Sequence, residues 1–107
     1  MPLPPALTPE QRLAALAKAA EARRIRAEVK EQLKDERLTL AELFDRAEGN
    51  DVLAKLKVVS MLESMPSTGK VKARRLMRDL DISDSRRIKG LGPNQRQKLL
   101  EHFGRNP

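Results

Sequence analysis

The chain has 107 residues, with 22 Lys and Arg against 15 Asp and Glu, and a formal net charge of +7 at pH 7. It contains no Cys and a single His, which excludes disulfides, thiolate chemistry and a metal site built from cysteines or paired histidines. No segment is long and apolar enough to cross a membrane or to form the apolar part of a signal peptide, so we expect one small, soluble, cytoplasmic domain without a cofactor.

The excess positive charge is confined to the C-terminal part of the chain. Residues 1–66 contain 11 basic and 11 acidic side chains, whereas residues 67–107 contain 11 basic and 4 acidic ones. Such a concentration indicates a nucleic-acid partner, although a solubilising basic surface would have the same composition. Only Phe44 and Phe103 are aromatic. Because proteins that read single strands usually stack bases on aromatic rings, the backbone of a duplex is the favoured target.

Residues 1–5 contain three prolines and are expected to form a loose end. Residues 8–11 then have the pattern of a helix start, with Thr8 as N-cap, Pro9 at the first helical position and Gln11 closing a capping box. No Gly or Pro follows before about Lys34, which predicts one long helix. Its apolar stripe is thin, so we expect the C-terminal half to pack on the domain and the N-terminal half to project. The stripe consists of Leu13, Leu16, Ala20, Ile25, Val29 and Leu33.

Three arginines in this helix, Arg23, Arg24 and Arg26, have the charge needed to touch phosphates. Glu21 and Glu28 flank them, however, and charges at this spacing are typical of a solvated helix face. We favour the solvated face.

A second capping box at residues 39–42 predicts a short helix that ends at Gly49. Asn50 or Asp51 caps the next helical stretch, which continues to Pro66 with a break near Lys57. A further helix is expected from about Lys70 to Leu80. Val71, Leu76, Met77 and Leu80 are predicted to face inward, and Lys72, Arg74, Arg75 and Arg78 outward.

Ser83 is predicted to cap a short turn or helix that runs to Lys89, and Pro93 to begin the last helix. Leu99, Leu100 and Phe103 complete the core before Gly104. No segment has the pattern of a strand. The predicted fold is therefore all-α, with residues 1–38 as an N-terminal tail and long helical arm and residues 39–107 as a small helical domain.

Residues 65–70 form the first of two glycine-bearing turns that precede basic helices. Gly69 permits a left-handed backbone, and the amides from Gly69 to Val71 lie at a helix start, where the helix dipole also favours an anion. The hydroxyls of Ser67 and Thr68 can donate to a phosphate. An ordinary connection between two helices would use the same residue types.

The second turn lies within residues 86–96, where Arg86, Arg87 and Lys89 directly precede a Gly-Leu-Gly sequence. Leu91 is expected to fill the core while Gly90 and Gly92 bring the backbone close to a ligand. Asn94 and Gln95 can donate to phosphate, sugar or base edges. Two adjacent arginines repel each other unless an anion lies beside them, so we favour a phosphate site over a plain connection.

Residues 55–103, with a helix, a glycine turn, a helix and a second glycine turn, resemble the helix-two-turn-helix DNA-binding domain. Together with residues 3–12, the Ala- and Arg-rich helix and Lys57-Val58, nearly the whole chain is similar to the actinobacterial integration host factor family, and residues 86–92 are the most specific part of the match. The resemblance implies a nucleoid-associated protein that binds duplex DNA with little sequence preference, alters its shape and topology and supports phage integrase recombination. Our hypothesis is a monomer in solution that bends or condenses the DNA. A β-armed heterodimer of the same name is unrelated.

The resemblance places DNA contacts on both turns. In proteins of this family, the resemblance implies, the second turn covers the bound DNA. This chain departs from the family pattern at the first turn, where Thr68 replaces a small apolar residue, so we expect phosphate to be held slightly differently there. With Arg74 on the following helix, the predicted DNA-binding residues are Ser67, Thr68, Gly69, Lys70, Lys72, Arg74, Arg86, Arg87, Lys89, Gly90, Gly92 and Asn94.

Three other functions are compatible with parts of the sequence. Some glycosylases with the same motif use an N-terminal proline amine, but Pro2 here is followed by Leu3 rather than an acidic residue, and the chain has no cysteines for a zinc finger. We therefore predict no enzymatic activity. A ribosome-associated RNA-binding module is the main alternative, because a ribosomal small-subunit protein uses a related arrangement. In a third interpretation, the long helix recruits a recombinase.

Overall fold

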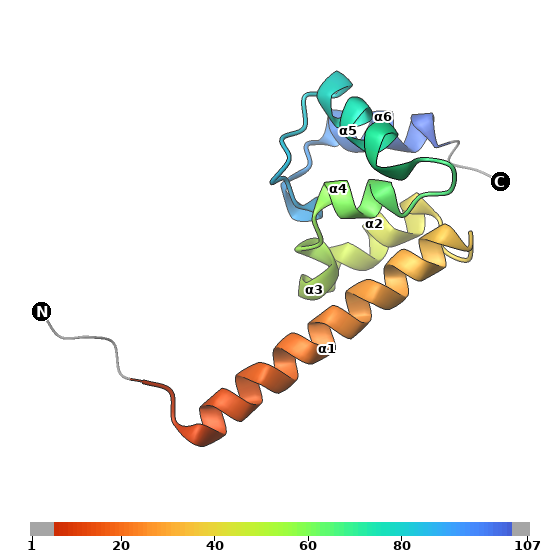
Figure 1. The fold of residues 1–107 in the computed structure, drawn as a ribbon. Helices are drawn as coiled ribbons and strands as arrows, with labels where there is room; N and C mark the ends of the chain where they lie inside the picture. Colours follow the sequence, from red (N-terminus) through yellow and green to blue (C-terminus); the bar gives the residue numbers. More distant parts are fainter. Residues whose placement is uncertain (1–5, 104–107) are drawn as a thin grey trace, which may run out of the picture.

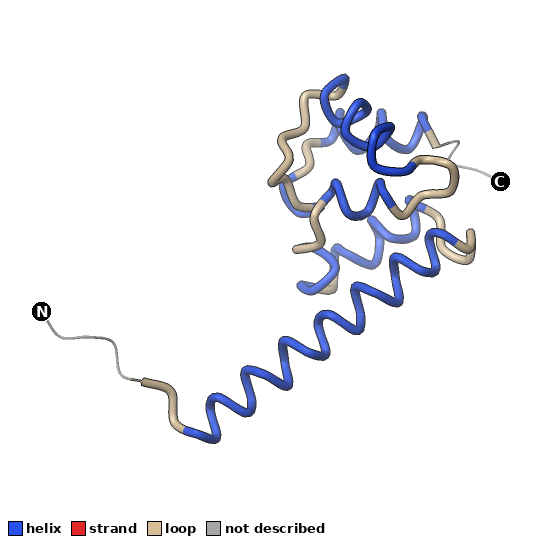
Figure 2. The backbone as a smooth tube through the Cα atoms, in the orientation of Figure 1, coloured by secondary structure: helices blue, strands red, loops and turns tan. Residues whose placement is uncertain are grey.

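The computed structural model describes residues 6–103 and contains six α-helices and one 3-10 helix in that range (Figure 1). The predicted loose end at residues 1–5 and the predicted stop at Gly104 lie outside the described residues. Figure 2 shows helices joined by short loops and no strand in the described range, as the sequence predicts. The elements are α1 (Pro9–Lys34), α2 (Leu40–Glu48), α3 (Asp51–Ala54), α4 (Val58–Glu63), α5 (Gly69–Asp79), η1 (Ile88–Gly90) and α6 (Pro93–His102).

Both predicted capping boxes are formed. The Thr8 hydroxyl accepts from the Gln11 amide while the Gln11 side chain accepts from the Thr8 amide, and Thr39 and Glu42 repeat this arrangement. The hydrogen bond from the Thr39 amide lowers the pKa of Glu42 below its ordinary value. These bonds satisfy amides that would otherwise lack an acceptor, which fixes the two helix starts where the sequence predicts them.

The long helix α1 is an arm anchored at one end. Val29 and Leu33 are 5% and 1% exposed, whereas Leu13 and Leu16 are 68% and 59% exposed. Figure 1 shows the N-terminal half of α1 extending away from the other helices. The Cα radius of gyration is 16.3 Å, against about 13 Å expected for a compact chain of this length. The predicted anchored and projecting halves are therefore both present.

Charges on the projecting helix are paired with one another. Arg24 contacts Glu21 and Glu28 on the same helix, and this pairing lowers the pKa of Glu21. Ion pairs this exposed contribute little to stability. This pairing is the arrangement expected of a solvated helix face at Arg24.

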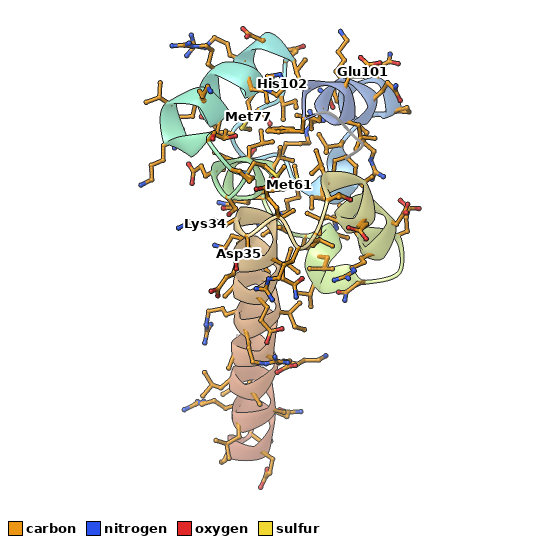
Figure 3. The ribbon with its side chains drawn as sticks, turned by 90° about the vertical axis from the view of Figure 1, so that its right-hand side faces the viewer. Lys34, Asp35, Met61, Met77, Glu101 and His102 are labelled. Atoms are coloured by element: carbon orange, nitrogen blue, oxygen red, sulfur yellow. The ribbon has the colours of Figure 1, made fainter. Side chains whose placement is uncertain are left out.

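One hydrophobic core joins all the helices, and α1 contributes to it through Val29 and Leu33. In Figure 3, Met61 of α4 and Met77 of α5 lie inside this core, where they are 0% and 1% exposed. The isolated bridge between Lys57 and Arg87 adds a backbone pairing between distant segments. This bridge coincides with the predicted break near Lys57.

The predicted end of α2 at Gly49 is confirmed, with a φ of −114° rather than a left-handed conformation. Two other local predictions were wrong in detail. Val71 is 73% exposed rather than inward, and Ala73, at 0%, occupies the buried face of α5 instead. The 3-10 helix begins at Ile88 with Arg87 as its cap, whereas Ser83 contributes only its carbonyl to a turn with the Arg86 amide.

Candidate nucleic-acid interface

The first turn, which connects α4 to α5, contains two residues in the left-handed backbone conformation. Ser67 and Gly69 have φ values of +61° and +68°. Glycine tolerates this region freely, but a serine there costs about 1 kcal/mol or more. Only Gly69 is expected from the sequence, because a serine gives no signal for a left-handed conformation.

This turn leaves the start of α5 open. The Thr68 side chain does not cap the helix, and among the described residues the amides of Gly69, Lys70 and Val71 have no acceptor. The Thr68 hydroxyl instead donates to the Pro66 carbonyl at 3.4 Å. The free amides and the dipole of an 11-residue helix converge at the turn, which is the arrangement that binds an anion.

Lysines surround the first turn. Lys70 and Lys72 are exposed, and the Lys72 ammonium donates to the Ser67 carbonyl at 3.2 Å. The turn also lines an open groove of about 840 Å³, to which Lys30 and Lys34 of the arm contribute. The structure thus brings together five of the predicted residues, namely Ser67, Thr68, Gly69, Lys70 and Lys72.

The second turn is held against the linker between α3 and α4. The Val58 amide donates to the Arg86 carbonyl at 2.9 Å, and the Ile88 amide donates to the Leu56 carbonyl at 3.0 Å. Ile88 and Leu91 fill the core beneath the turn, at 0% and 7% exposed. Leu91 therefore fills the core as predicted, and the turn is fixed before Gly90 by backbone bonds and between its two glycines by Leu91.

The arginines of the second turn have partners within the protein. The Arg86 guanidinium donates to the Gly90 carbonyl at 2.8 Å and to Gln95 Oε1 at 3.4 Å. The Arg87 guanidinium donates to the Lys55 carbonyl at 2.6 Å. Carbonyl oxygens thus stabilise the adjacent cations, so the prediction that this pair requires an anion was wrong. Arg87 stays exposed and Arg86 half-buried, so both retain surface from which to contact a phosphate.

Gly90 leaves room for the side chain of the neighbouring Arg86. A Cβ at this position would lie 2.9 Å from the Arg86 side-chain Cδ, closer than carbon atoms normally approach. Glycine therefore lets the guanidinium fold back over the turn.

Gln95 has a structural function rather than the predicted donor function. Its Oε1 accepts from the Gly92 amide at 3.0 Å, and its Nε2 donates to the Asp81 carbonyl at 3.1 Å. The side chain thus joins the second turn to the end of α5. Asn94 and Lys89, by contrast, are exposed and make no side-chain hydrogen bond within the described residues.

Arg74 lies between the two turns on the exposed side of α5. Its guanidinium is 3.8 Å from the Asp84 carboxylate. Arg74, Arg78 and Arg86 line a hollow of about 650 Å³ at the far end of α5 from the first turn. The predicted residues therefore form two groups, one at each end of this helix.

Comparison with known proteins gives concordant matches. Residues 33–103 match the S13-like H2TH domain. The integration host factor of Streptomyces coelicolor is 55% identical over 104 residues, covering 97% of this chain and 96% of that protein. The chain belongs to the integration host factor family. The integration host factor of Mycobacterium tuberculosis is 52% identical over 100 residues, covering 94% of this chain and 95% of that protein.

A solved member of the integration host factor family has the same fold. Its structure is described as sIHF bound to an 8-bp palindromic DNA, and it superimposes with a TM-score of 0.80 at 50% sequence identity. The match covers 82% of this chain and 99% of that one. The resemblance inferred from the sequence is therefore confirmed, both for the family and for the all-α fold.

None of the helices in residues 6–103 is long and apolar enough to cross a membrane.

Proposed function

We propose that this chain is a nucleoid-associated protein that binds the sugar-phosphate backbone of duplex DNA with little sequence preference. The observation that carries the proposal is the structural similarity to an integration host factor described as bound to DNA. The open start of α5, and the exposed cations of both turns, supply the chemistry, because backbone amides and lysine or arginine side chains bind phosphate irrespective of the base.

The proposed contacts are the free amides and hydroxyls of the first turn, the cations beside them, Arg74, and the exposed side chains of the second turn. The half-buried Arg86 contributes one edge of its guanidinium while another edge holds Gly90. A protein that binds only the DNA backbone positions and shapes the DNA without covalent chemistry, and we propose no enzymatic activity. The full set is Ser67, Thr68, Gly69, Lys70, Lys72, Arg74, Arg86, Arg87, Lys89, Gly90, Gly92 and Asn94.

Binding is expected to depend steeply on salt. If about five or six phosphates are neutralised, log affinity should fall against log salt with a slope of about −4.5 to −5.5. The measurement is a titration of one labelled duplex across a salt series, with unrelated duplexes and a structured RNA as competitors. Equal competition by all duplexes and poor competition by RNA supports the proposal. A flat slope contradicts it.

RNA binding is the second candidate, favoured by the S13-like description of the matched domain. A ribosomal small-subunit protein has a related helix-turn arrangement, and free amides with cations bind the phosphates of either nucleic acid. The same competition experiment separates the two candidates, because a structured RNA that displaces the duplex would assign the site to RNA.

We further propose that the protein acts as a monomer in the cytoplasmic nucleoid, bends or condenses DNA, and supports phage integrase recombination through its arm. Residues 1–38 would form this arm and residues 39–107 the DNA-binding domain. The exposed Leu13 and Leu16 on the projecting half of α1 are available to a protein partner.

Deleting residues 1–22 tests the arm, since this truncation keeps the anchoring side chains Ile25, Val29 and Leu33. The truncated chain is expected to bind DNA with unchanged affinity and to lose recombination in a reconstituted integrase reaction. Full recombination by the truncated chain would contradict a function of the arm in partner recruitment.

A further inference from the structure

The groove of about 840 Å³ beside the first turn has one wall made by the arm. Lys30 and Lys34 of α1 line it together with Gly69 and Lys70, which lie 35 to 40 residues further along the chain. In Figure 3, the Lys34 side chain leaves the end of α1 on the side where α5 lies. Tertiary packing thus places two lysines of the arm beside the helix start that we propose binds phosphate.

The lysines of this groove carry uncompensated charge. Within residues 6–103, no carboxylate oxygen lies within 4.0 Å of the ammonium of Lys30, Lys34 or Lys70, whereas Arg24, Lys55 and Arg96 each have such a partner. Glu28, which is close to Lys30 in the sequence, pairs with Arg24 instead. One acidic side chain, Glu63, lines the groove against these three cations.

We propose that this groove extends the DNA-binding surface onto the arm, with Lys30 and Lys34 each binding a backbone phosphate next to the one held by the first turn. The inference deepens the proposed function and rests on it. Two lysines one helical turn apart on an anchored segment point the same way without a large ordering cost, because Val29 and Leu33 already fix that part of α1. A compact ammonium on a long stem suits a phosphate in an open groove.

The test is the K30A/K34A variant of the full chain in the salt series. Loss of two phosphate contacts should reduce the slope by about 1.8 units and weaken binding by about 60-fold near 0.1 M salt. The matched control is K18A/R46A, which removes two exposed cations that line neither the groove nor the turns. Equal effects in the two double variants would overturn the proposal, since they would show only a general loss of charge.

A second variant, E63Q, tests the groove through an expected gain in affinity rather than a loss. If a phosphate lies beside Glu63, then E63Q removes a repulsion and should strengthen binding several-fold, whereas D45N on the exposed side of α2 should not. An E63Q affinity equal to that of D45N counts against the proposal. Thermal unfolding of each variant identifies any effect that arises from loss of structure.

The outcomes also separate this inference from the proposed function. If the unmodified chain shows a steep slope and K30A/K34A matches its control, the groove assignment fails while DNA binding stands. If the unmodified chain has a flat slope, both fail.

Discussion

Replacing both Arg86 and Arg87 with alanine is expected to weaken binding to all duplexes alike and to reduce the salt slope by about one to two units. Each phosphate contact contributes about 0.9 to that slope. Near 0.1 M salt, the loss of one or two contacts corresponds to about 10- to 60-fold weaker binding. Because neither side chain is proposed to read a base, unrelated duplexes should lose affinity in the same proportion.

The same arginines also hold the second turn together, so the alanine variant changes two things at once. The Arg86 guanidinium donates to the Gly90 carbonyl, and the Arg87 guanidinium donates to the Lys55 carbonyl. The R86K/R87K variant keeps both charges but removes the planar guanidinium that reaches two acceptors. If charge alone matters, this variant keeps the full slope. A lower affinity with an unchanged slope would instead assign the effect to the position of the turn.

A folded R86A/R87A variant with unchanged affinity and slope would contradict the assignment of the second turn to DNA. Circular dichroism and thermal unfolding establish that it is folded. Ile88 and Leu91 anchor the turn independently of the arginines, so we expect the variant to remain folded.

Local signals in the sequence predict much of this fold correctly. The capping boxes at Thr8 and Thr39 depend only on residues three apart, and their hydrogen bonds form as expected. The exposed Val71 shows where local signals fail. Ala73 and Met77 are buried on α5, and Leu76 and Leu80 are half-buried beside them at helical spacing, whereas Val71 is apolar but out of phase. A small side chain at position 73 suits the close packing of α5 on α4.

The types of residue in the candidate site could be predicted from the sequence, but the partners that their side chains contact could not. Gln95 is suitable for donating to DNA, yet it bonds to the Asp81 carbonyl 14 residues away. The arm lysines resemble a solvated face until packing places them beside Gly69. Both cases depend on which distant segments meet, and short-range spacing contains no information about that.

Anchoring of the arm is tested by one substitution made at two positions of the same helix. L33A is expected to lower the free energy of unfolding by about 2–5 kcal/mol, because Leu33 is 1% exposed and alanine would leave a cavity. L16A removes the same atoms at a side chain that is 59% exposed, and should change stability by less than about 0.5 kcal/mol. Urea denaturation of both variants measures the difference.

The larger loss has a consequence for DNA binding as well as for stability. A cost of this size corresponds to a fall in Tm of about 10–30 °C for a domain of this size. Even below the lowered Tm, where the L33A variant is folded, the cavity at position 33 loosens α1, and Lys30 and Lys34 are no longer held at the groove. L33A should therefore bind DNA more weakly, while L16A binds normally. Equal stability of L33A and L16A would show that the arm is not anchored through Leu33. If L33A is destabilised but keeps full affinity, the anchor stands and the arm lysines do not contact DNA.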